Sequence, residues 1–177
     1  GTFMENIRKL CKIPEWVYPS WIISAALFFA SASYGYQGEI FPIEKASIPM
    51  MDIYINNMKM LIHNTLGIFL LGIPNLLSGF LNGYAAGEAI HCALYSFGPS
   101  WLFQSFLPHG IFEIPVILLA VSFGTLPWII LYRKIRYPQN SLKELCLGTL
   151  KYLARMFILA SILLLIAACI ERYISMN

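Results

Sequence analysis

Residues 109–131 read HGIFEIPVILLAVSFGTLPWIIL, a run whose only ionisable side chains, His109 and Glu113, lie near its start. A bilayer core about 30 Å thick is crossed by about 20 apolar residues at a rise of about 1.5 Å per residue. The run therefore predicts a transmembrane helix with two polar side chains close to one membrane surface.

Four more segments have this apolar character: residues 17–34, 58–73, 75–97 and 150–170. The composition agrees, because 58% of the residues are hydrophobic, 12% are charged and the mean hydropathy is +0.66. Such a chain cannot cover a soluble globule with polar surface, so a soluble enzyme, a nucleic-acid-binding protein and a disordered chain are excluded. The sequence predicts an all-α, polytopic transmembrane bundle of about five spans, forming a single integral membrane domain over residues 1–177.

The basic residues predict the orientation of this bundle. Nine of the twelve lie before the first span or between the fourth and the fifth: Arg8, Lys9, Lys12, Arg133, Lys134, Arg136, Lys143, Lys151 and Arg155. Loops rich in Lys and Arg stay in the cytoplasm. We therefore expect a multi-pass protein with its N-terminus inside, whose first span is an uncleaved anchor. Residues 99–108 are too short to cross and predict an interfacial or re-entrant segment between the third and fourth spans.

Ionisable groups inside the membrane are costly and often functional. Three histidines and two glutamates fall within the predicted spans, all in the outer half of the bilayer: His63, Glu88, His91, His109 and Glu113. Glu88-x-x-His91 and His109-x-x-x-Glu113 each place an acid and an imidazole on neighbouring points of one helix face. Helical bundles use the first of these patterns to present metal ligands inward. We expect the five side chains to converge, with Asn64 and Asn82 beside them as substrate-binding residues.

The third span also carries a stripe of small residues, Gly79, Gly83 and Gly87, which permits close contact between helix backbones. We read the stripe as helix packing, with Ala120 and Gly124 of the fourth span as its expected partners. The next position in steps of four is His91, so the stripe leads toward the expected site.

Three interpretations of the polar residues stay open. They could hold the helices together through interhelical hydrogen bonds, act as a proton relay, or form a metal site used for hydrolysis. We favour the metal site, because two histidines, a glutamate and a water molecule form a recurrent open zinc shell. His91, His109 and Glu88 are the expected ligands, His63 is a substitute ligand, and Glu113 is the expected general base.

The sequence also resembles a known family. Leu81-Asn82-Gly83-x-x-x-Gly87 followed by Pro108-His109-Gly110-x-x-Glu113 is similar to the stage II sporulation protein M family of polytopic membrane proteins, over about residues 55–130. The resemblance implies work with cell-wall hydrolases during engulfment or, among relatives encoded with circular bacteriocins, maturation, export or immunity. Intramembrane peptidase activity is a hypothesis that the resemblance permits.

These observations lead to one preferred function and one alternative. We expect an intramembrane metal-dependent peptidase, with zinc as cofactor, that acts on a hydrophobic peptide in the cell membrane of a prokaryote. The alternative is a non-enzymatic subunit of an export, immunity or envelope-remodelling complex. The expected partners are the lipid bilayer and a hydrophobic peptide or membrane-protein helix, a homo-oligomer stays open, and nucleic acid is excluded.

Overall fold

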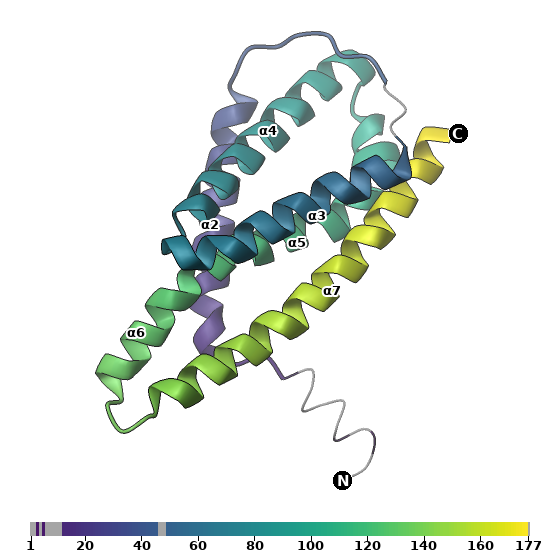
Figure 1. Ribbon diagram of the computed structural model, residues 1–177. Coiled ribbons are helices and arrows are strands. Elements are labelled where there is room, and N and C mark those ends of the chain that lie inside the picture. Colours follow the sequence, from purple (N-terminus) through teal and green to yellow (C-terminus); the bar gives the residue numbers. More distant parts are fainter. Residues whose placement is uncertain (1–2, 4, 6–11, 46–48, 177) are drawn as a thin grey trace.

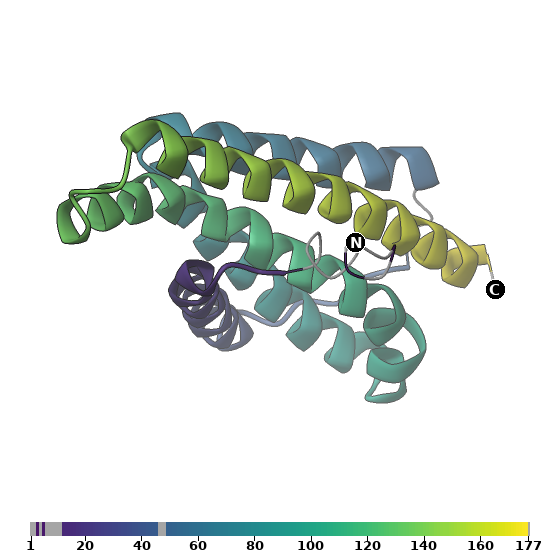
Figure 2. The same ribbon diagram turned by 90° about the horizontal axis from the view of Figure 1, so that it is seen from below.

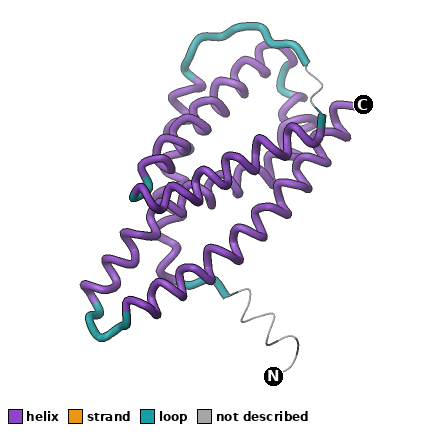
Figure 3. Tube along the Cα trace, viewed as in Figure 1, coloured by secondary structure: helices purple, strands orange, loops and turns teal. Residues whose placement is uncertain are grey.

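The computed structural model describes residues 3, 5, 12–45 and 49–176, with side chains up to residue 174. The described chain between residues 12 and 176 is built of helices and the loops that connect them (Figure 3), which confirms the all-α class. The helices group into five rods: Glu15–Val17 with α2 (Tyr18–Tyr36); α3 (Met50–Leu66) with Gly67–Leu70; α4 (Ile73–Phe97); Leu102–Phe106, α5 (Leu107–Ser122), Phe123–Thr125 and α6 (Leu126–Arg136); and α7 (Leu142–Met176).

Three stretches of the described chain are long and apolar enough to cross a membrane: Glu15–Tyr36, Leu102–Arg136 and Leu142–Ile174. The rods that contain α3 and α4 lie in the same bundle but are less apolar, because α3 carries Asp52 and Lys59 and α4 carries Asn75, Asn82 and Glu88. The membrane character is therefore clear, whereas the number of five spans stays a prediction.

Several helices extend beyond the predicted apolar segments. Helix α3 begins at Met50 rather than at residue 58, and α7 covers residues 142–176 rather than 150–170. Hydropathy detects the part of a helix that suits lipid, whereas a helix continues into water wherever its backbone stays hydrogen-bonded. Asp52 in the first turn of α3 stabilises such an exposed start through the helix dipole.

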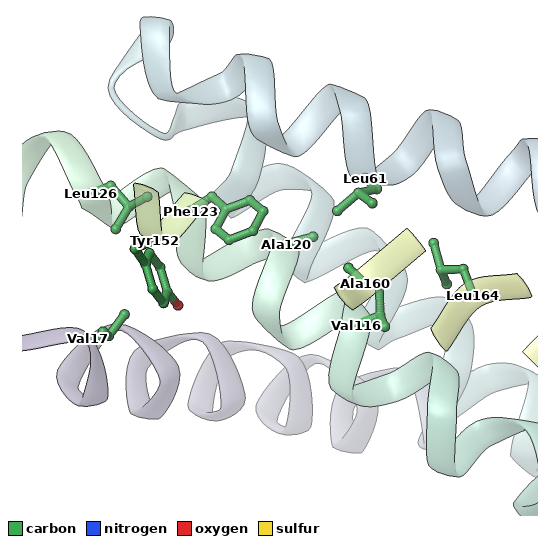
Figure 4. Close-up of a cluster of buried hydrophobic side chains, with 9 residues drawn as sticks. All are labelled: Val17, Leu61, Val116, Ala120, Phe123, Leu126, Tyr152, Ala160 and Leu164. Carbon is green, nitrogen blue, oxygen red and sulfur yellow. The ribbon is translucent and has the colours of Figure 1, made fainter. Parts of the chain in front are cut away.

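Helix α5 occupies the centre of the bundle (Figures 1 and 2) and contacts α2, α3, α4 and α7. The main apolar cluster lies along it (Figure 4) and consists of Val17, Leu61, Val116, Ala120, Phe123, Leu126, Tyr152, Ala160 and Leu164. Any side chain on α5 that faces away from lipid must therefore meet another helix. This central position makes α5 the element best placed to hold a site.

The small-residue stripe of α4 packs on α2. A Cβ atom at Gly83 would lie 2.5 Å from the carbonyl oxygen of Phe28, and one at Gly87 would overlap the carbonyl oxygen of Ala32. The expected partners Ala120 and Gly124 were therefore wrong. Serines and a glycine recur along the buried face of α2 at Ser20, Ser24, Ser31 and Gly35, and this face provides the close approach.

The two ends of the bundle differ in charge. The turn that joins α6 to α7 lies at the same end as the start of α2 (Figure 1), and we call this the basic end. There the guanidinium of Arg133 stacks 5.0 Å above the ring of Trp16. Arg8 and Lys9, which contribute to the predicted orientation, lie outside the described residues. The connection from α2 to α3 and the end of α7 form the opposite end, and the orientation in the membrane stays a prediction.

Candidate metal centre

Three side chains come together at the opposite end of the bundle. His109 and Glu113 on α5 and Glu171 on α7 each offer one ligand atom, and these atoms lie within 4.8 Å of one another. Among the described residues, this is the one group of at least three His, Cys, Asp or Glu side chains with such spacing. The cluster joins the first two turns of the central helix to the last turns of α7.

A local irregularity of the helix positions His109. Residues Leu102–Phe106, where an interfacial or re-entrant segment was expected, form a π-helical turn that continues into α5. The ring of Phe106 packs edge-on against the imidazole of His109, with 6.0 Å between the ring centroids, and covers the buried Gly110. Wide turns of this kind occur often at functional sites, because they re-aim the side chains that follow.

The charges of the cluster require a partner. Glu113 and Glu171 are only partly exposed, and two carboxylates this close repel each other unless a proton or a cation lies between them. The Nδ1 atom of His109 is buried and has no hydrogen-bond partner among the described residues. Two carboxylates and one imidazole are suitable ligands for a divalent transition-metal ion. The residues therefore fit a metal ion, and they leave coordination positions open.

A small cavity of about 270 Å³ adjoins the cluster. Its polar lining comes from His109 and Glu113 of α5 and from Asn82 of α4, whereas Glu171 does not line it. The apolar part of the lining consists of Phe28, Ala85, Ala86, Phe106, Ile114 and Ile117. The three members of the cluster therefore differ in position: His109 and Glu113 line the cavity, and Glu171 lies outside its lining.

The two asparagines predicted to bind substrate have different surroundings. Asn82 lines the cavity and donates from its Nδ2 to the carbonyl oxygen of Ser78 at 2.8 Å. Asn64 is fully buried and donates to the Ser78 hydroxyl at 2.9 Å, while its own carbonyl oxygen accepts a 2.7 Å bond from Asn75. Asn64 therefore joins α3 to α4 in a buried network and does not line the cavity.

The structure does not bring the other three predicted ligands into the cluster. His91 is the next residue along the glycine stripe, and because that stripe faces α2, its imidazole stacks on Tyr36, with 4.3 Å between the ring centroids. Glu88 lies about 100° from Gly87 of the stripe around α4, at about 100° per residue, and it is not among the residues that line the cavity. His63 is exposed on α3, whose buried face carries Leu61 and Asn64.

Glu171 is a site residue that sequence reasoning missed. It follows the predicted fifth span, so it was assigned to the span end rather than to a helix face. One sequence signal could have identified it, because the fifth span ends in the membrane layer where the fourth begins. In the structure, helix α7 continues past Glu171 to Met176.

Comparison with known proteins finds a family and one relative. A family model described as Stage II sporulation protein M matches residues 20–176. An uncharacterized protein of Methanocaldococcus jannaschii is 30% identical over 122 residues, which are 69% of this chain and 53% of that protein. The chain thus spans about half the length of this curated relative. No solved structure matches the chain.

The family match extends beyond the motif region at residues 55–130. It includes nearly all of α2, the glycine stripe of α4, both site residues of α5 and all of α7. Together with the three membrane-spanning candidates, this match shows a membrane protein, and the chain belongs to the stage II sporulation protein M family.

Proposed function

We propose that this membrane protein is a divalent-metal-dependent hydrolase that cleaves a hydrophobic peptide at one surface of the bilayer. The observation that carries the proposal is the 4.8 Å grouping of His109, Glu113 and Glu171 beside a cavity. Packing alone does not require three ionisable groups in this place, since each costs free energy inside the membrane. A bound cation would offset that cost.

The positions of the three side chains suggest their roles. His109 and Glu171 serve as ligands, because imidazole nitrogen and carboxylate oxygen are both common zinc donors. Glu113 lines the cavity and lies within 4.8 Å of both, so it is the carboxylate placed to take a proton from an attacking water molecule. The ion would supply Lewis-acid chemistry that polarises the scissile carbonyl.

The cavity limits the substrate. At about 270 Å³ it can hold one or two side chains and not a folded domain, so the peptide must arrive extended. The Asn82 amide can hydrogen-bond a peptide backbone, and its orientation is fixed by its bond to Ser78. The apolar lining favours a hydrophobic segment that enters from the bilayer.

We propose further that the chain lies in the cell membrane of a prokaryote with its N-terminus inside. The charge asymmetry supports this orientation, since basic residues cluster at one end of the bundle. The metal cluster would then face the outer surface, where water can reach it.

The experiment is a cleavage assay in proteoliposomes with a set of fluorogenic hydrophobic peptides. We expect zinc-dependent cleavage that stops on chelation and in the Glu113→Gln variant, and that persists in Glu88→Gln, a matched glutamate outside the cluster. Cleavage that survives both chelation and Glu113→Gln would contradict the proposal. So would a protein that binds stoichiometric metal and cleaves none of the peptides.

The second of these results would favour the alternative, a non-enzymatic subunit of an export, bacteriocin immunity or maturation, or envelope-remodelling complex. One observation supports this alternative: the cavity is slightly smaller than the range of about 300–1,000 Å³ typical of ligand sites. In that case the ion would tie α5 to α7 and would shape a surface for a partner helix.

A further inference from the structure

A second cavity lies away from the metal cluster, toward the basic end. This groove has a volume of about 790 Å³ and runs between α2, α5 and α7. Its lining is apolar with the exception of Arg155, which is the one charged residue among the described residues that line it. Ile22 and Ile158 on its rims are 69% and 61% exposed, so the groove opens to the outside of the bundle.

Aromatic contacts establish the depth of Arg155. Its neighbour Tyr152, one helical turn away, accepts a 3.0 Å hydrogen bond from Nε1 of Trp21 and packs edge-on against Trp16, with 5.6 Å between the ring centroids. Tryptophan and tyrosine gather where membrane meets water. This pattern indicates that Tyr152 lies near the membrane surface and that Arg155, about 4.5 Å deeper along α7, lies within reach of lipid headgroups.

The length of the groove matches a lipid chain. From Arg155 to Leu163, which also lines it, α7 rises about 12 Å at about 1.5 Å per residue. One leaflet of the hydrocarbon core is about 15 Å thick, half of about 30 Å. A single acyl chain that starts beside Arg155 would thus occupy the length of the groove.

Charge favours an anionic headgroup. Lys151 and Arg155 are four residues apart and so lie on the same face of α7. Arg133, stacked on Trp16, and Lys12 add positive charge at this end of the bundle. Basic side chains at this depth attract anionic lipids.

We propose that the groove between α2, α5 and α7 is a binding site for one anionic phospholipid, with its acyl chain in the groove and its phosphate on Arg155. The site is separate from the metal cluster and does not rest on the proposed hydrolase. The bound lipid would fill the space that the three helices leave open beside the central helix.

Native mass spectrometry of the full chain in detergent tests the site, with phosphatidylglycerol and phosphatidylcholine of identical acyl chains as probes. We expect the wild type to retain phosphatidylglycerol about fivefold better than phosphatidylcholine. This is the effect expected of one basic side chain near an anionic headgroup. Arg155→Gln should abolish the preference and Arg155→Lys should keep most of it. Arg136→Gln, at the same end but outside the groove, should leave it unchanged.

A second variant tests the groove itself and does not alter charge. Ala25→Phe places a ring in the groove from α2 and should reduce retention of both lipids. In a separate competition experiment with the wild type, excess soluble glycerol phosphate should displace neither lipid. Equal retention of the two lipids by the wild type would overturn the proposal, as would an unchanged preference in Arg155→Gln. Retention of a polypeptide or a second copy that Ala25→Phe removes, without any effect on lipid, would assign the groove to protein instead.

Discussion

The seam between α2 and α4 and the seam between α5 and α7 are built on opposite principles. In the first, Gly35 of α2 and Gly83 and Gly87 of α4 bring the helix backbones into direct contact. In the second, larger side chains such as Val116 and Leu164 fill the core, and ionisable groups gather at one end. Packing explains these glycine contacts of the first seam. The second contains charges that packing does not need, and this difference identifies it as the functional seam.

The largest expected loss of stability comes from a substitution in the first seam. Gly83→Leu forces a side chain against the Phe28 carbonyl, and an overpacked core of this kind costs about 3 kcal/mol. Thermal unfolding in detergent, followed by tryptophan fluorescence, should show a large loss of stability. Gly148→Leu is the matched control, because a Cβ atom at Gly148 meets nothing within 4 Å, and it should unfold near the wild-type temperature. Equal stability of the two variants would refute the account of the seam.

The next effect concerns the second seam. An ion that is bound by residues of both α5 and α7 stabilises the folded chain by about 2.7 kcal/mol when its free concentration is a hundredfold above its dissociation constant. Zinc should therefore raise the unfolding temperature of the wild type and leave that of Glu171→Gln unchanged. A similar zinc response in both proteins would mean that the ion binds elsewhere.

A smaller effect tests the polar network between the seams. Asn75 donates to the carbonyl oxygens of Asn64 at 2.7 Å and Ala120 at 3.2 Å, which links the turn between α3 and α4 to the central helix. Hydrogen bonds between membrane helices contribute about 0.6 kcal/mol on average, so Asn75→Ala should cost about 1 kcal/mol for the pair. The same unfolding assay measures this loss. Metal binding should persist, and its disappearance would show that the network supports the site directly.

The smallest effect lies at the basic end. Tyr152→Phe removes the acceptor of the Trp21 hydrogen bond and keeps the ring that packs on Trp16, so it should cost about 0.6 kcal/mol. The unfolding temperature should fall slightly, with zinc binding intact. A loss as large as that of Gly83→Leu would mean that this end, and not the glycine seam, controls the stability of the bundle.

The sequence was sufficient for the fold class because hydropathy reports directly on burial in lipid. Residues 109–131 and 150–170 fall inside apolar helices of the structure, and the family resemblance extends over most of the chain. Helix ends were less predictable, as the start of α3 at Met50 shows, since a helix in water leaves no hydropathy signal.

The site was predictable only along one helix. The spacing of His109 and Glu113 places them together whatever surrounds them, so local geometry sufficed. Partners on other helices depend on helix rotation, which a single sequence does not reveal. Because the glycine stripe faces α2, His91 turns to Tyr36, and Glu171 of α7 completes the cluster instead.

The central claim is that His109, Glu113 and Glu171 hold a divalent cation. Metal analysis of the purified chain, after incubation with zinc and removal of the excess, tests it most directly. The account predicts stoichiometric zinc in the wild type and in His63→Ala, His91→Ala and Glu88→Gln, and loss of the metal in His109→Ala and Glu171→Gln. A wild type without metal would contradict the account, and so would metal that is retained in Glu171→Gln and lost in His91→Ala.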